Sequence, residues 1–479
     1  PIAGTRSCAS SSAVSGGVSG GRRSLSNDPS AAPLYWNGTD TAANDRAHVF
    51  HSWSAQALIN PVAIAGGEGS WIWDFDGNRY LDFSSQLMNV NLGHGHPTLV
   101  AAIQEAAGRL ATIGPFHANA DRSEAARLIA DVAPDGMNKV FFTNGGADAN
   151  ENAIRMARLH TGRHKILSAH RSYHGATAGA ITMTGDPRRW ASEPSMPGVV
   201  RFFGPYPYRS SFHSESPEQE CERALAHLDE LVMFEGAHNV AAIIIEPVVG
   251  TNGILVPPDG YLVGMRELCD RHGIMMISDE VMAGFGRCGE WFAIQRWDVT
   301  PDLICFAKGV NSGYVPLGGV IMSDAIAATF DERVYPGGLT YAGHPLACAS
   351  AVASIGVFRE EGTLHAARTL GDDVIGPELE AMAERHPSVG EVRGLGAFWA
   401  IELVRDRATR EMYVPYNAAG DAAKPMNDVV AAIKELGVWV FAHFNRIHIT
   451  PPCNTSHDDV RNGLAAIDKA LEVADAHIA

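Results

Sequence analysis

Short apolar runs recur along the middle of this chain, and longer segments of helical character separate them. Six runs predict buried strands: 139–142, 165–168, 241–245, 274–278, 302–306 and 319–322. Alternation of this kind favours an α/β fold, in which helices cover a mainly parallel sheet. Open sheets of this class bind ligands where the carboxyl ends of the strands meet. The residues that follow these runs are therefore the first candidates for function.

Two of the runs end in groups that can perform chemistry. Asp279 follows the run 274–278, and Lys308 lies just after the run 302–306. Lysine is rarely buried without a role, and the glycines that follow this one let the backbone turn tightly. A lysine amine can hold an aldehyde as a Schiff base, and a carboxylate can keep a pyridinium nitrogen protonated. The pair therefore predicts a Schiff-base cofactor.

The composition argues against several other classes of protein. With 479 residues the chain is too long for one minimal core. Its net charge of −17 disfavours nucleic acid and anionic membranes as partners, and no apolar run approaches the length of a membrane span. Seven scattered cysteines indicate reduced thiols in the cytoplasm. His94-Gly95-His96 lacks a third ligand nearby, so we expect no metal.

The first 33 residues differ in composition from the rest. They are rich in serine and glycine, and they hold three arginines but no acidic residue before Asp28. A basic, serine-rich segment is typical of an organelle transit peptide, which would place the protein in an organelle matrix instead. We favour a disordered leader, because the glycines would spoil an amphipathic helix.

Several motifs, in the same order, resemble the class III (ω-type) pyridoxal-phosphate aminotransferases over about residues 45–470. They are a predicted hairpin at Asp76-Gly77, Gly145-Gly-Ala-Asp148, Ser172-Tyr-His-Gly175, Asp279, Lys308 and Thr340. The resemblance implies a fold-type I transferase, with a large, mainly parallel sheet domain and a smaller α+β C-terminal domain. It divides the chain into a leader (1–33), an N-terminal segment (34–95), a large cofactor domain (96–345) and a small domain (346–479).

The resemblance also assigns residues to pyridoxal 5′-phosphate. Lys308 and Asp279 are the expected catalytic pair, with the lysine holding the cofactor and the aspartate contacting its ring nitrogen. The other expected cofactor contacts are Gly146, Ala147, Tyr173, His174, Glu246, Val281 and Thr340. Gly146 and Ala147 match the family's phosphate cradle, where Ala147 replaces a serine; backbone amides and the helix dipole must then bind more of the phosphate.

The substrate side of the site is less determined by the sequence. Leu87, Met88 and Phe116 match pocket-wall positions, although plain core is the equal alternative. Arg446 lies where many relatives place an arginine for the substrate carboxylate, but its spacing from Pro451-Pro452 is unusual, which leaves a structural role open. Met282 replaces the glutamine of relatives that act on ornithine or 4-aminobutyrate, and it is similar to the amine- or taurine-pyruvate branch.

The expected reaction is transamination by a ping-pong mechanism. An amine, taurine or ω-amino acid donates its amino group, and a keto acid, pyruvate above all, accepts it. Lys308 would move the proton, which requires burial to lower its pKa. The resemblance implies a homodimer in which Thr340 reaches the neighbouring subunit's phosphate, with a tetramer as the alternative. An aminomutase or a decarboxylating aminotransferase would share Lys308 and Asp279, whereas a non-catalytic homologue would have lost them.

Overall fold

The computed structural model describes residues 37–478, in two units: 37–63 and 64–478. The first unit contains α1 (Gly38–His48) and the 3₁₀ turn η1 (Gln56–Leu58). The side chain of Asn37 caps α1 by accepting a 2.8 Å hydrogen bond from the backbone N–H of Asp40, a common way to begin a helix. The leader predicted for residues 1–33 lies outside the described residues.

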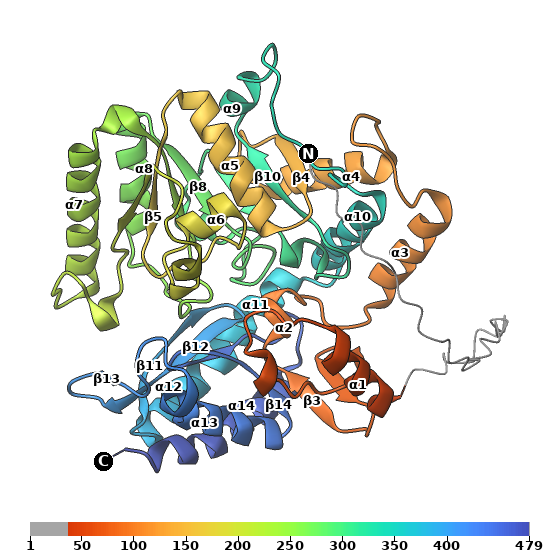
Figure 1. Ribbon diagram of the computed structural model, residues 1–479, viewed down its shortest axis with the longest axis vertical. Coiled ribbons are helices and arrows are strands. Elements are labelled where there is room, and N and C mark those ends of the chain that lie inside the picture. Colours follow the sequence, from red (N-terminus) through yellow and green to blue (C-terminus); the bar gives the residue numbers. More distant parts are fainter. Residues whose placement is uncertain (1–36, 479) are drawn as a thin grey trace, which may run out of the picture. The chain divides into compact units, whose positions relative to one another are not determined.

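The second unit is built around a seven-stranded sheet with the order β4-β10-β9-β8-β7-β5-β6 (Figure 1). β10 is antiparallel to both of its neighbours, and the other neighbouring strands are parallel. This confirms the predicted α/β fold with a mainly parallel sheet. The strands are β4 (Lys139–Thr143), β5 (Lys165–Ala169), β6 (Val199–Phe202), β7 (Val240–Ile245), β8 (Met275–Asp279), β9 (Leu303–Phe306) and β10 (Gly318–Met322). The six predicted strands are present, and β6 is an additional one.

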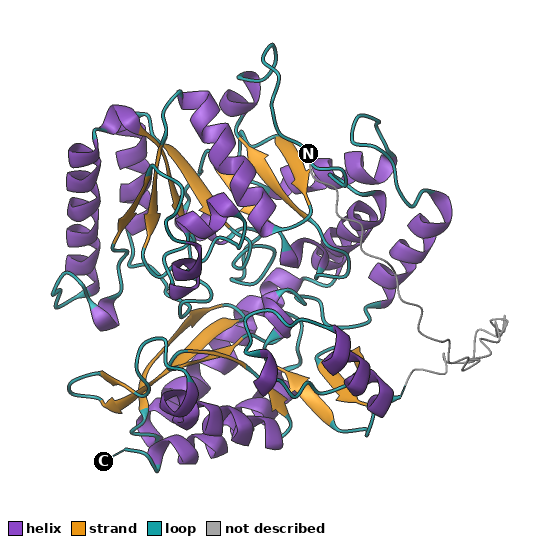
Figure 2. Ribbon diagram, viewed as in Figure 1, coloured by secondary structure: helices purple, strands orange, loops and turns teal. Residues whose placement is uncertain are grey.

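Both faces of this sheet are covered by helices (Figure 2). Successive residues of a strand point to opposite faces of the sheet, so both faces are apolar and both need a cover. Leu167 and Ile243 belong to the core on one face, and Ile166 and Ile244 belong to the core on the other. The second core includes the apolar face of α5. The helices of this region are α3 (Pro97–Arg109), α4 (Ala120–Val132), α5 (Gly146–Thr161), α6 (Ala178–Met183), α7 (Pro217–Glu235), α8 (Tyr261–His272), α9 (Asp324–Ala328) and α10 (Pro345–Glu360). Within residues 37–478 no helix is both long and apolar enough to cross a membrane.

A small sheet joins the two ends of this unit. It contains β1 (Ile64–Glu68), β2 (Trp71–Asp74), β3 (Arg79–Asp82) and β14 (Val438–Trp439). β2 and β3 form the predicted hairpin, and Gly77 takes the left-handed φ of +85° that the turn requires. β14 adds to β3 in parallel, so the hairpin packs with the C-terminal part of the chain.

The third sheet holds β11 (Val389–Leu395), β12 (Phe398–Asp406), β16 (Arg446–Ile449) and β15 (Phe441–His443), with β13 (Glu411–Met412) paired to β12. β12 begins at Phe398 because Gly396, with φ of +57°, forms the turn before it. The remaining helices are α11 (Thr363–Leu370), α12 (Gly376–Arg385), α13 (Lys424–Glu435) and α14 (His457–Asp475). Residues of α12, α13, α14, β12 and β16 share one apolar core.

A strained turn, α2 (Ser85–Met88), follows β3. Three residues of this turn have positive φ angles: 42° at Ser85, 60° at Gln86 and 53° at Met88. Residues other than glycine rarely adopt this backbone conformation. The hydroxyl of Ser85 donates a 2.6 Å hydrogen bond to the carbonyl of Thr450, which fixes this turn against the C-terminal part of the chain. Strain of this kind is retained at functional sites more often than elsewhere.

Candidate functional site

Three ionisable groups gather at the carboxyl ends of neighbouring strands. β7 leads into Glu246, β8 ends at Asp279, and β9 is followed by Lys308. These strands are adjacent and parallel, so their ends meet at one edge of the sheet. Lys308 takes a left-handed φ of +47° where the chain turns out of the strand. The structure thus brings Glu246 together with Asp279 and Lys308, the two groups predicted from the strand ends.

Asp279 is buried and bound on both carboxylate oxygens. His174 Nδ1 lies 2.8 Å from its Oδ2, and the side-chain amide of Asn150 donates a 2.7 Å hydrogen bond to the same oxygen. The backbone N–H of Val281 donates to its Oδ1 at 3.1 Å. Burial alone would lower the pKa of His174, but the hydrogen bond and the charge of Asp279 raise it overall. Asp279 and His174 therefore form one buried, hydrogen-bonded pair.

Lys308 and Glu246 both have shifted pKa values. Burial lowers the pKa of Lys308 to about 8, against the opposing charges of Asp279 and Glu246. Burial raises the pKa of Glu246 to about 7; the charge of His174 opposes the rise and that of Asp279 adds to it. Buried groups with perturbed pKa values are typical of catalytic sites. An amine with a pKa near 8 exchanges protons readily at neutral pH.

Backbone groups hold the Glu246 carboxylate. The N–H of Tyr173 donates to Oε1 at 2.9 Å and the N–H of Gly250 donates to Oε2 at 2.8 Å. Tyr173 lies two residues beyond Arg171, in the turn after β5. The guanidinium of Arg188 covers its ring, with Cζ 3.5 Å from the ring centroid. The Ser172–Gly175 motif therefore reaches both acidic groups, through Tyr173 to Glu246 and through His174 to Asp279.

The start of α5 packs closely against this group. A side-chain carbon at Gly146 would lie 2.7 Å from Val281 Cγ1, so the position requires glycine. One at Gly175 would lie 2.5 Å from the Ala147 methyl group, and a larger residue at 147 would crowd the same space. The first N–H groups of a helix have no acceptor within it, so a helix start next to Gly175 and Val281 suits an anion such as phosphate.

The other predicted residues lie in different environments. Met88 is buried in an apolar cluster with Phe398 and Ala400, whereas Leu87 is 44% exposed and Phe116 is 92% exposed. Thr340 is exposed in the loop before α10. The structure groups Gly146, Ala147, Tyr173, His174, Glu246, Val281, Asp279 and Lys308, whereas Leu87, Phe116 and Thr340 are exposed side chains.

Arg446 is fully buried on β16, opposite Glu402 on β12. Its Nε donates a 3.1 Å hydrogen bond to Glu402, which also binds Arg393 and Arg209. Its two terminal nitrogens have no hydrogen-bond partner among residues 37–478. His94 and His96 each have a carboxylate partner, Asp82 and Glu361 respectively.

Two residues of the site were not predicted from the sequence. Asn150 bridges Asp279 and the carbonyl of His174, both at 2.7 Å, and Arg188 covers Tyr173. Asn150 lies four positions after Gly146, which places both on one face of α5; this spacing was the available signal. Arg188 has no comparable signal, since its position depends on the turn that begins at Asp186.

Comparisons with known proteins agree with this geometry. The family model of class III aminotransferases matches residues 53–471. The chain is 31% identical to the taurine–pyruvate aminotransferase of Bilophila wadsworthia over 91% of this chain and 98% of that one. It is 37% identical to the putrescine–pyruvate aminotransferase of Pseudomonas aeruginosa, over 73% of this chain and 78% of the relative.

A solved aminotransferase structure is also similar to this chain, in sequence and in fold. The taurine:2-oxoglutarate aminotransferase of Bifidobacterium kashiwanohense, in complex with PLP and glutamate, superposes with a TM-score of 0.89 at 42% identity. The match covers 92% of this chain and 99% of that chain. The fold-type I assignment and the predicted family are thereby confirmed.

Proposed function

Because the chain belongs to the class III aminotransferases and uses pyridoxal phosphate, we propose that it moves an amino group from an amine, taurine or an ω-amino acid to pyruvate in a ping-pong cycle. One observation carries the proposal. Lys308, with a pKa lowered to about 8, lies at the strand end next to Asp279, whose carboxylate is bound by His174 and Asn150. This pairing of a proton-transferring amine with a fixed negative charge suits transamination.

The residues present fit the cofactor. Gly146 and Ala147 begin α5, where backbone N–H groups would bind the phosphate. Asp279 would contact the ring nitrogen, and Val281 and Tyr173 would lie against the ring. Arg188 covers one face of Tyr173, so the ring would use the other face or displace the guanidinium. Nε2 of His174 is buried without a partner within residues 37–478, which leaves a donor or acceptor free there.

The protein's own groups have separate tasks in this proposal. When bound, pyridoxal phosphate supplies an electron-accepting ring that stabilises negative charge on the carbon next to the donor's nitrogen. The Nζ of Lys308 would remove the proton from that carbon and return it at the far end of the reacting system. Asp279 would keep its negative charge beside the ring nitrogen, and Glu246 would face the substrate.

The choice of substrates rests on the relatives and on Met282. The relatives named above act on taurine or putrescine, with pyruvate or 2-oxoglutarate as acceptor. Met282 lies beside Gly250, next to Glu246. Its apolar side chain offers no strong hydrogen-bond or charge partner for a second polar group of the substrate. This supports simple amines, taurine or ω-amino acids as donors. Pyruvate is our proposed acceptor, and 2-oxoglutarate is the competitor to test.

We also propose a homodimer with composite sites. Thr340 is exposed, as expected if it contacts the phosphate bound to a second copy of the chain. Light scattering should then give twice the chain mass of 51.2 kDa and not the single mass. The six described cysteines form no disulfide, which supports the cytoplasm as compartment.

Capture of the cofactor should depend on pH through Lys308. Only the neutral amine attacks the aldehyde, and the pKa of Lys308 is lowered from 10.5 to about 8. The rate of capture by cofactor-free protein should rise about tenfold per pH unit below 8 and level off above it. Stopped-flow absorbance measures the rate. Nα-acetyl-lysine, the matched control, should keep rising to about pH 10; a protein profile that follows the control would contradict the shifted pKa.

The test of the function is a half-reaction experiment. The purified, cofactor-loaded protein should be yellow, and β-alanine, taurine or a simple amine without keto acid should bleach it. Pyruvate should restore the colour and appear as alanine; 2-oxoglutarate run in parallel decides between the acceptors. Product formed from one substrate alone, without bleaching, would instead indicate an aminomutase or a decarboxylating enzyme.

A further inference from the structure

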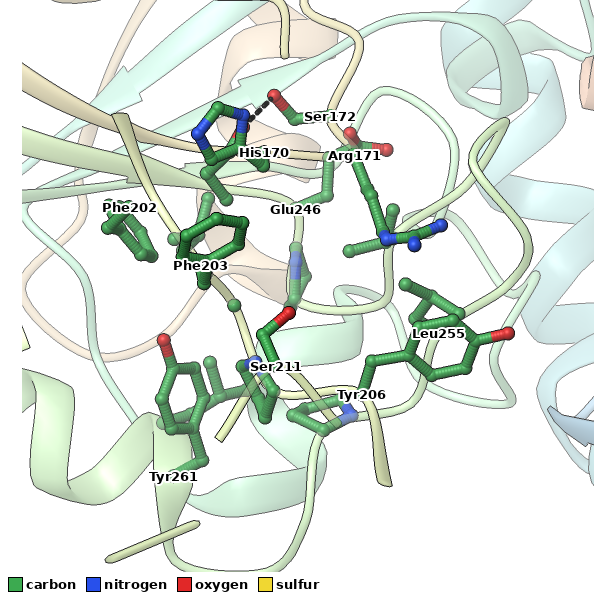
Figure 3. A pocket seen from close by; sticks show the side chains of 18 residues that line it. His170, Arg171, Ser172, Phe202, Phe203, Tyr206, Ser211, Glu246, Leu255 and Tyr261 are labelled. Carbon is green, nitrogen blue, oxygen red and sulfur yellow. Dashed lines mark hydrogen bonds between the residues drawn. The ribbon is translucent and has the colours of Figure 1, made fainter. Parts of the chain in front are cut away.

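A cavity adjoins the candidate site, over the carboxyl ends of β5, β6 and β7 and the start of α8 (Figure 3). Its volume, which includes space open to the solvent, is about 780 Å³. Glu246 lines it, and the charge of the same carboxyl group acts on the pKa of Lys308. The cavity therefore neighbours the reaction centre, shares Glu246 with it, and extends away from Asp279 and Lys308 towards β6.

The walls of the cavity are mostly apolar. Phe203, Leu255 and Leu262 line it, together with prolines and Phe202. Tyr261 also lines it, is only 4% exposed, and has a hydroxyl group without a hydrogen-bond partner in the described part of the chain. A buried hydroxyl left unpaired costs about 1–3 kcal/mol. A polar atom of a bound molecule, or a water, would remove this cost.

One cation at the cavity has no acidic partner. Arg171 lines the cavity, and among residues 37–478 no carboxylate lies within ion-pairing distance of its guanidinium. Its Cζ lies 5.2 Å from the ring centroid of Tyr206, another lining residue, and Figure 3 shows both side chains at one side of the cavity. Arg171 adopts a left-handed φ of +60°, a strain that long side chains rarely accept.

Positive charge is in excess around Arg171. The adjoining cluster holds Arg209, Arg393 and Arg446 against the carboxylates of Glu391 and Glu402. Burial lowers the pKa of Arg171 and the charge of Arg446 lowers it further, while the charges of Tyr206 and Glu402 oppose the fall. Buried charge is stable only when it is paired. With Glu246 at the cavity included, four arginines face three carboxyl groups, which still leaves one positive charge for a negative ligand.

We propose that this cavity binds an amphipathic organic acid, with its carboxylate or sulfonate paired to Arg171 and its apolar body against Phe203 and Leu255. The unpaired hydroxyl of Tyr261 gives a further polar contact. The ligand needs neither an amino group nor a keto group, so the proposal goes beyond the function proposed above. The acid could be part of a substrate or a separate effector, and the kinetics below distinguish these two sources.

The test uses 3-phenylpropionate as probe and 3-phenylpropan-1-ol as its neutral counterpart. Calorimetric titration of the cofactor-loaded protein should give an affinity at least about tenfold higher for the acid, the equivalent of one modest charge pair. Arg171→Gln should abolish that preference, and Arg171→Lys should keep most of it. Arg127→Gln, which removes an exposed arginine on α4, should leave both affinities unchanged. Because no turnover is needed, the result does not depend on transaminase activity.

A second variant locates the binding. Ser211 is exposed at the edge of the cavity, so Ser211→Trp should fold normally and block the entrance; binding of both probes should fall. If the acid raises the donor's KM alone, it occupies part of the substrate site, and if it lowers kcat it acts as a separate effector. Equal affinities for acid and alcohol, or equal effects of Arg127→Gln and Arg171→Gln, would overturn the proposal.

Discussion

Replacing Lys308 by alanine is expected to lower kcat by about 10⁴-fold and to remove the yellow colour of the loaded protein. The amine both holds the cofactor and moves the proton, and general acid–base catalysis alone contributes up to about 10⁴. No other lysine among residues 37–478 follows a strand of the central sheet at the site's edge. Steady-state rates with the donor found in the half-reaction experiment measure the loss, and the visible spectrum measures the attachment.

Two further variants separate lost chemistry from lost structure. Lys308→Met keeps the volume but removes an amine whose charged form burial disfavours. The cofactor-free Met variant should therefore melt no lower than the cofactor-free parent, while its activity is lost. Small amines added to the alanine variant should restore part of the rate by accepting the proton. A Lys308→Ala protein that kept its activity within tenfold would refute the assigned role.

The central sheet and its reactive edge were predictable because both leave local signals. Apolar runs such as 241–245 are long enough to form a buried strand, and an acid or lysine directly after one stands out. Neighbouring parallel strands then bring Glu246, Asp279 and Lys308 together without further information. β6 was missed because Val199–Phe202 is short and includes Arg201, which interrupts the apolar pattern.

Contacts between distant segments could not be derived from the sequence. Asn150 meets Asp279 across 129 positions, and Arg446 meets Glu402 through the pairing of β16 with β12. The register of that pairing decides whether Arg446 faces a carboxylate or a substrate, and no local pattern specifies it. The roles of Leu87, Phe116 and Thr340, and the domain boundaries at residues 95 and 345, stay predictions.

Replacing Asp279 by asparagine should lower kcat by about 10²–10³-fold while Lys308 still captures the cofactor. The substitution keeps the shape of the side chain but removes the charge that would stabilise a protonated ring nitrogen, and loss of one such electrostatic contact costs about that much. Asp279 raises the pKa of His174, so that pKa should fall in the variant. The yellow colour with a slow half-reaction is therefore the expected combination, measured by stopped-flow absorbance.

Glu246→Gln is the matched control, because it removes a buried carboxyl group from the next strand end. Burial raises the pKa of Glu246 to about 7, so the group is largely protonated below pH 7 and charged above it. The control should therefore change the rate little at pH 6 and more at pH 8, whereas Asp279→Asn should be impaired at both. If the two variants lost the same activity at pH 6, any buried carboxyl group at this edge would serve, and the specific pairing of Asp279 with the ring nitrogen would be wrong.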